Sequence, residues 1–134
     1  MAIDRQTEAL HHLVPFARTL GIELVVRTPT EVRARMRWAE ALSTGGEILH
    51  GGAIMSLADT TGATCAVENL PEGAAGTTTV ESKTNFLRPV RNDYAEAVSR
   101  PLHRGRSFIV VETDVLDGTG ELAARVTQTQ AVLR

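Results

Sequence analysis

One stretch of fifteen residues constrains the fold more than any other part of this 134-residue chain. Within residues 53–67, the only charged side chain is Asp59, and the others are apolar, small or hydroxyl-bearing. They are spread all round a helical wheel rather than along one stripe, which is typical of a buried helix. A carboxylate in such a helix is costly unless it is paired or used. The stretch therefore predicts a central buried helix that carries a functional acid, Asp59.

Two glycines, Gly51 and Gly52, follow His50 at the start of this helix. Backbone N–H groups at a helix N-terminus are unpaired and favour anionic oxygen, which makes Gly51 a candidate oxyanion donor. Gly51 and Asp59 are separated by about 12 Å of helical rise. Donor and base must both reach the same reacting group. We therefore expect an obligate homodimer, with antiparallel helices and two sites shared across a two-fold interface.

The N-terminal segment, residues 1–20, has helical spacing of its apolar residues. Asp4 is a candidate N-cap, and Gly21 is expected to end the segment. Pro15 predicts either a kink or two short helices. His11 and His12 are expected on its surface.

Six runs have the composition or alternation of β-strands: residues 22–27, 31–38, 76–88, 93–102, 106–115 and 121–133. Turns are expected at residues 28–30, 90–92, 103–105 and 117–120. The row of Arg33, Arg35 and Arg37 is interpreted as a solvated strand face rather than a binding patch. The order of elements predicts one α+β domain over residues 1–134, in which a long curved antiparallel sheet wraps around the central helix.

The overall composition excludes several classes of function. A net charge of −2 indicates no strong field for nucleic acid or membrane, and no run of about 18 apolar residues is present. A single cysteine, Cys65, excludes an internal disulfide and favours the cytoplasm. The four histidines and this cysteine lack metal-ligand spacing, so no metal and no cofactor are expected.

Three motifs together resemble the hotdog-fold acyl-CoA thioesterases of the PaaI-like group: His50-Gly51-Gly52, Leu57-Ala58-Asp59-Thr60 and Phe86-Leu87-Arg88-Pro89. The resemblance covers roughly residues 15–134. It implies a hotdog fold, a homodimer often paired into a homotetramer, and hydrolysis of an acyl-CoA whose coenzyme A is part of the substrate.

The resemblance also implies roles for single residues. Asp59 matches the catalytic acid, which either activates water or attacks the carbonyl directly. Gly51 matches the N–H that polarises the carbonyl, and His50 the histidine that shapes this loop. Thr79 falls where relatives place a water-orienting hydroxyl, with Thr77, Thr78 and Ser82 as competitors. Arg88 lies near the position where relatives bind CoA phosphates.

Substrate-binding candidates complete the set. Several relatives carry an Asn six residues before the histidine, where this chain has Thr44, so we expect that role to be altered or moved to Glu47. Gly52 is included because the helix entry needs an absent side chain. Arg104 and Arg106 join Arg88 as candidates for phosphate recognition through charge-assisted hydrogen bonds.

Other readings remain open at this point. Asp59 could be a structural acid, and His50 could be a helix-start residue satisfied by backbone. A non-catalytic acyl-CoA sensor would keep the Gly51 site without needing Asp59. A dehydratase is disfavoured, because no histidine follows Asp59 until His103. Small residues at Gly62, Ala63 and Ala66 suggest room for an aryl or a small to medium acyl group.

Overall fold

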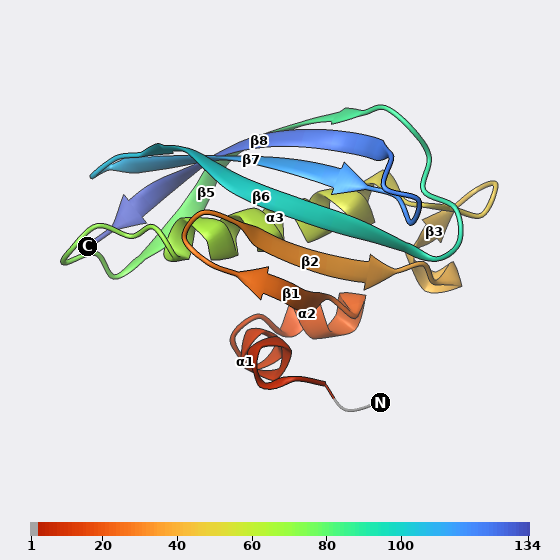
Figure 1. Cartoon of the computed structure of the whole chain (residues 1–134), viewed down its shortest axis with the longest axis horizontal. Helices are drawn as coiled ribbons and strands as arrows, with labels where there is room; N and C mark the ends of the chain where they lie inside the picture. Colours follow the sequence, from red (N-terminus) through yellow and green to blue (C-terminus); the bar gives the residue numbers. More distant parts are fainter. Residues whose placement is uncertain (1–2) are drawn as a thin grey trace.

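A curved six-stranded antiparallel sheet wraps around one long helix in the computed structural model, which describes residues 3–134 (Figure 1). The elements follow in the order α1 (Arg5–Leu13), α2 (Pro15–Leu20), β1 (Glu23–Arg27), β2 (Val32–Arg37), the 3-10 helix η1 (Glu40–Leu42), β3 (Ser43–Thr44), β4 (Ile48–Leu49), α3 (Gly51–Val67), β5 (Gly76–Phe86), β6 (Tyr94–Arg104), β7 (Phe108–Leu116) and β8 (Leu122–Leu133). The predicted α+β architecture is confirmed.

The sheet has the strand order β1-β2-β6-β7-β8-β5, so β1 and β5 are its two edges. Helix α3 packs against β2 and β5 to β8, within the curve of the sheet. Its fully buried side chains, such as Leu57 and Cys65, belong to the same core cluster as the buried strand residues Met36, Ile109 and Val126. Helices α1 and α2 lie outside the curve beside β1.

The N-terminal segment forms two helices that meet at Pro15, as predicted. Asp4 caps α1, since its Oδ1 accepts a hydrogen bond from the N–H of Thr7 over 2.8 Å. Gly21 ends α2 in the left-handed conformation, with φ of 70°. This conformation is readily available to glycine because it lacks a Cβ.

The expected surface position of His11 is wrong. Its side chain is buried, and its Nε2 donates to the carbonyl of Ile22 over 2.6 Å. The Thr7 hydroxyl accepts from the N–H of Leu24 over 3.0 Å. Two side chains of α1 therefore form hydrogen bonds with backbone groups in β1 and in the residue just before it. These bonds hold α1 against the edge of the sheet.

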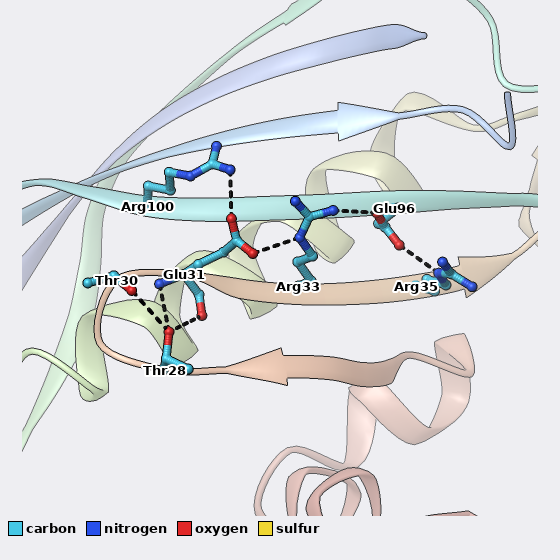
Figure 2. A network of polar contacts seen from close by, with 7 residues as sticks. All are labelled: Thr28, Thr30, Glu31, Arg33, Arg35, Glu96 and Arg100. Atoms are coloured by element: carbon cyan, nitrogen blue, oxygen red, sulfur yellow. Dashed lines mark hydrogen bonds and ion pairs between the residues drawn. The ribbon is translucent and has the colours of Figure 1, made fainter. Parts of the chain in front are cut away.

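The arginine row on the outer face of β2 is engaged by neighbouring carboxylates (Figure 2). Glu96 accepts from Arg33 over 3.1 Å and from Arg35 over 2.6 Å, and Glu31 accepts from Arg33 and Arg100. Arg37 lies 3.7 Å from a carboxylate oxygen of Glu23. These internal pairs agree with the interpretation of the row as a solvated face.

The turn expected at residues 103–105 is misplaced. Strand β6 continues to Arg104, which pairs with Ile109 of β7, and a register shift between Pro101 and His103 accommodates the extra length. Cross-strand pairing thus outweighs the local turn propensity of this segment, and the chain reverses after Arg104 instead.

Helix α3 is not buried all round, which corrects the prediction. Asp59 is exposed, and Met55 and Val67 on the same face are each 40% exposed. Exposed or half-exposed positions recur along one stripe: Gly52, Met55, Ser56, Asp59, Thr60, Ala63 and Val67. The sheet covers only the opposite face, so a nearly uncharged helical face is left uncovered by this chain's own strands. Within residues 3–134, no helix is both long and apolar enough to cross a membrane.

Candidate active site

The start of α3 presents one free backbone donor. His50 is the N-cap, and its Nδ1 accepts a hydrogen bond from the N–H of Gly52 over 2.8 Å. The ring nitrogen that accepts this bond carries no proton, so His50 acts here as a cap satisfied by backbone. Among residues 3–134, no acceptor takes the N–H of Gly51. The helix start can therefore offer that N–H to a carbonyl oxygen.

Gly51 lies at the wall of an open groove of about 500 Å³. A Cβ on Gly51 would lie 3.1 Å from the ring of Phe86, and φ is not positive at Gly51 or Gly52. Close approach of another side chain, rather than an unusual backbone conformation, explains the glycine at position 51. The groove is also lined by Thr44, Arg88 and Arg91, so it combines an apolar floor with two cations.

Asp59 is held by side chains from two strands. Its Oδ1 accepts from the hydroxyl of Thr79 on β5 over 2.9 Å and from Nε2 of Gln128 on β8 over 3.1 Å. Gln130 donates in turn to Thr79 Oγ1 over 2.5 Å. Among the residues that the structure describes, both donors reach Oδ1 and none reaches Oδ2. One carboxylate oxygen is thus fixed while the other is available to a ligand or water.

Register selects Thr79 from the three consecutive threonines. Thr79 pairs directly with Gln130, and a register shift follows between Thr79 and Glu81. Sequence reasoning placed Thr79 near Asp59 but missed Gln128 and Gln130. Their signal is weak, because the run Thr127-Gln128-Thr129-Gln130 is polar on both faces of the strand. The flanking Val126 and Val132 are the clue that the even-numbered residues face inward.

A second cavity, of about 300 Å³, adjoins Asp59. Helix α1 supplies Leu10 and Leu13, Val14 lies between α1 and α2, and α3 supplies Ala63 and Val67. Arg27 also lines this cavity, where its Nε donates to Glu68 over 3.1 Å. The cavity is therefore mainly apolar, with an ion pair beside it.

Three small residues of α3 were expected to leave room for an acyl group, and Gly62 does not leave such room. A Cβ at Gly62 would lie 1.9 Å from Gln128 Oε1, so the side chain of Gln128 occupies that space. Ala66 is fully buried in the core. Ala63 lines the cavity beside Asp59.

Gly51 and Asp59 do not meet within one chain. Gly51 lines the groove and Asp59 lines the cavity, and neither residue lines the other's space. This separation agrees with the helical rise between them. A single carbonyl could contact both groups only if they came from different copies of the chain.

The remaining candidates for substrate binding do not all lie at one cavity. Thr44 and Arg88 line the Gly51 groove, whereas Glu47, Arg104 and Arg106 do not. Glu47 lies in the β3–β4 turn with φ of 57°, and its carbonyl accepts from Trp38 Nε1. Arg104 ends β6, and Arg106 lies in the turn between β6 and β7. The three arginines are therefore not gathered by one chain.

Binding of a metal ion would require a cluster of ligand side chains. Among residues 3–134, no group of three or more His, Cys, Asp or Glu side chains is arranged to hold a metal ion. Cys65 is fully buried, and burial raises the pKa of its thiol to about 11. A thiol of this kind is a core residue rather than a nucleophile.

The architecture defines the class first: a sheet wrapped round a central helix is the hotdog fold of thioesterases. A thioesterase from Haemophilus influenzae superposes with a TM-score of 0.87 at 27% identity, covering 96% of this chain and 90% of that one. A thioesterase family protein from Silicibacter pomeroyi superposes with a TM-score of 0.86 at 26% identity, covering 96% of each chain.

Sequence comparison identifies the family. The model of the thioesterase superfamily matches residues 46–124, which include the helix start, Asp59 and Thr79. A candidate esterase of Saccharolobus solfataricus is 32% identical over 115 residues, covering 86% of this chain and 75% of that relative. The chain belongs to the thioesterase superfamily, and it is a hydrolase of that superfamily with the hotdog fold.

Proposed function

We propose that this hydrolase is an acyl-CoA thioesterase that uses Asp59 as its general base or nucleophile. The observation that carries the proposal is the Asp59 carboxylate, with Oδ1 restrained by two donors and Oδ2 unpaired among residues 3–134. An apolar cavity lies beside it, where an acyl group could be desolvated. A positioned carboxylate next to a substrate-sized cavity is the arrangement that general-base catalysis requires.

The reaction requires one nucleophile and one proton acceptor. Water loses a proton to Asp59 and attacks the thioester carbonyl, the C–S bond breaks, and the proton passes to the departing CoA thiolate. In the alternative route, Asp59 attacks the carbonyl itself, the C–S bond breaks and CoA leaves as the thiolate, and water then hydrolyses the resulting mixed anhydride to the free acid and regenerates Asp59. In both routes the carbonyl oxygen gains negative charge, which the free N–H of Gly51 would stabilise.

The Gly51 donor would come from a second copy of the chain. The uncovered stripe of α3, with Met55 and Val67, offers an apolar face for a partner. Strand β5 is an edge strand of eleven residues that exposes Val80, and a long unprotected edge invites pairing. Pairing of two β5 edges about a two-fold axis would join the sheets and bring the two α3 helices side by side, antiparallel.

This homodimer would also unite the scattered arginines. Arg88 shares a groove with Gly51 at the start of α3, whereas the β6–β7 turn, which carries Arg104 and Arg106, lies towards the C-terminal end of the helix (Figure 1). Antiparallel α3 helices would bring Arg88 of one copy towards Arg104 and Arg106 of the other. Guanidinium groups gathered in this way could bind the phosphates of coenzyme A, with Thr44 and Gly52 flanking the thioester.

The acyl group would occupy the cavity between α1 and α3. The cavity follows α3 from Asp59 to Val67, over about 12 Å of helix. Within the described part of the chain, Arg27 is the one cation in its walls, and it is already paired with Glu68. This volume and lining favour an aryl group or a small to medium straight acyl chain over a bulky or polar one.

A thiol-release assay tests the proposal directly. Purified protein is supplied with a panel of aryl- and alkyl-CoA thioesters, and released CoA is followed with a thiol reagent, beside Asp59→Ala and the acidic control Glu81→Ala on β5. We expect turnover of at least one thioester by the native chain and Glu81→Ala, with a loss of at least about a hundredfold in Asp59→Ala. Tight CoA binding without turnover on any member would instead identify a non-catalytic sensor.

A further inference from the structure

We infer that Gln128 and Gln130 of β8 are positioning residues that hold Asp59 and Thr79 in the reactive arrangement. The inference rests on the proposed function, because it concerns the same carboxylate. Neither glutamine belongs to the motifs that the family resemblance covers. Each acts through another side chain rather than through contact with substrate.

Burial is the first observation. Gln128 and Gln130 are each only 1% exposed, and they face α3 from within the sheet. The positions on either side of them along this face hold Val126 and Val132. An apolar side chain would fill such positions without the desolvation cost that an amide carries. The hydrogen bonds of these two neighbouring inward amides therefore explain their presence on an otherwise apolar face.

The direction of those bonds is set by the chemistry of Asp59. An ionised carboxylate only accepts, so the Gln128 group within 3.1 Å of Oδ1 must be Nε2. Gln130 Nε2 donates into the oxygen of Thr79, which orients the single hydroxyl proton of Thr79 towards Asp59 Oδ1 over 2.9 Å. Both donors thereby converge on the same oxygen.

This convergence matters because Asp59 is on the exposed face of α3. A surface aspartate rotates about two side-chain torsions, and each rotamer points the carboxylate differently. With Oδ1 fixed from β5 and β8, Oδ2 alone is presented to water or to the thioester. Small displacements of a catalytic group are sufficient to reduce turnover strongly.

Gly62 on α3 also contributes to the position of Gln128. Its missing side chain admits Gln128 Oε1, which would be 1.9 Å from a Cβ at that position. The same Oε1 is buried without a hydrogen-bond partner among residues 3–134. Burying an acceptor without a hydrogen bond costs free energy. The hydrogen bond from Nε2 of Gln128 to Asp59 offsets this cost and explains why the amide lies there. Gly62, one turn beyond Asp59, lets the amide reach the carboxylate.

The first test replaces each glutamine by methionine, which keeps the length and volume but removes the donor. We expect Gln128→Met and Gln130→Met to lower kcat by about tenfold or more while KM changes less than about twofold. Thr129→Val is the matched control, on the same strand but with its side chain on the other face, and it should keep the native kcat. Thermal melting checks that all three variants fold.

The second test separates positioning from a structural role. In an Asp59→Ala background, Gln128→Met should have no further effect on kcat, because a residue that acts only through Asp59 loses its role with it. Gly62→Ala, which keeps both Gln128 and Asp59, should reproduce the loss of kcat by displacing the amide. An equal loss from Gln128→Met with and without Asp59 would overturn the inference.

The outcomes distinguish the inference from the function on which it rests. If the native chain hydrolyses thioesters and Gln128→Met and Gln130→Met keep the native kcat, the positioning role is wrong and the thioesterase assignment stands. If the native chain hydrolyses no thioester on the panel, the proposed function fails, and the positioning role fails with it.

Discussion

Thr79 on the edge strand β5 and Asp59 on helix α3 are joined by a hydrogen bond of 2.9 Å between Oγ1 and Oδ1. The bond connects residues that are twenty positions apart in sequence. It places a hydroxyl beside the carboxylate at the rim of the cavity lined by α1 and α3. The pair links the geometry of the sheet edge to the chemistry proposed for the helix.

Thr79→Val should lower kcat by about tenfold, because it removes a donor to Asp59 while it retains the shape and β propensity of the side chain. Thr79→Ser should retain most of the native rate. The neighbouring Thr78→Val serves as the control on the same strand. Equal rates for native protein and Thr79→Val, measured under saturating acyl-CoA, would remove Thr79 from the mechanism.

Leu13→Trp should shift acyl preference towards shorter chains. Leu13 lines the cavity and is 79% exposed. The larger indole ring should therefore occupy part of the cavity without distorting the core. We expect kcat/KM for the longest accepted acyl-CoA to fall by about tenfold relative to the shortest. Leu102→Trp, at an exposed position on β6, should leave the profile unchanged. A profile unaffected by Leu13→Trp would place the acyl group elsewhere.

Cys65 should resist thiol reagents in the folded protein. Burial raises the pKa of its thiol to about 11, so the reactive thiolate is scarce at neutral pH, and the side chain is fully buried. Labelling with a thiol-specific disulfide reagent at pH 8 should be slow in native protein and complete in guanidinium chloride. Rapid labelling of native protein would show that the core opens at this position.

The pH dependence of stability should include a small contribution from Glu31. The hydrogen bond from Arg33, assisted by Arg100, lowers the pKa of Glu31 below its usual value near 4.5. The folded state therefore favours the carboxylate, and its contribution is present above that value and lost as pH falls below it. It is under about 1 kcal/mol for an ion pair at the surface.

Denaturant melts from pH 7 to pH 3 measure this contribution. The free energy of unfolding of Glu31→Gln should fall less with decreasing pH than that of native protein. The variant Glu40→Gln is a control, since Glu40 lies outside the network of Figure 2. Parallel curves for native protein and Glu31→Gln would contradict the lowered pKa.

The sequence predicted the central helix because fifteen residues with one charge are compatible with few other structures. It could not show that Met55 and Val67 lie on an uncovered face. A helix that is apolar all round looks the same whether its second face meets its own sheet or another chain. The correct separation of Gly51 and Asp59 nevertheless followed from helical rise alone.

Features that depend on strand register could not be derived from the residues alone. The family resemblance pointed to Thr79, but only its pairing with Gln130 separates it from the two threonines that precede it. Gln128 occupies space at Gly62, which was expected to be open, because the inward face of β8 could not be assigned from an evenly polar run. The motifs of the family located the acid, and the register of β5 on β8 determined what surrounds it.

Hybrid dimers test the central claim, that one chain supplies Asp59 and its partner supplies Gly51 to the same thioester. Gly51→Val, whose side chain would collide with Phe86 and fill the groove, and Asp59→Ala should each lose at least about a hundredfold of the native kcat alone. After co-refolding in equal amounts, half of the dimers are mixed and one of their two sites is intact. The mixture should recover about a quarter of native kcat. No recovery, with mixed dimers confirmed by native mass spectrometry, would contradict the shared site.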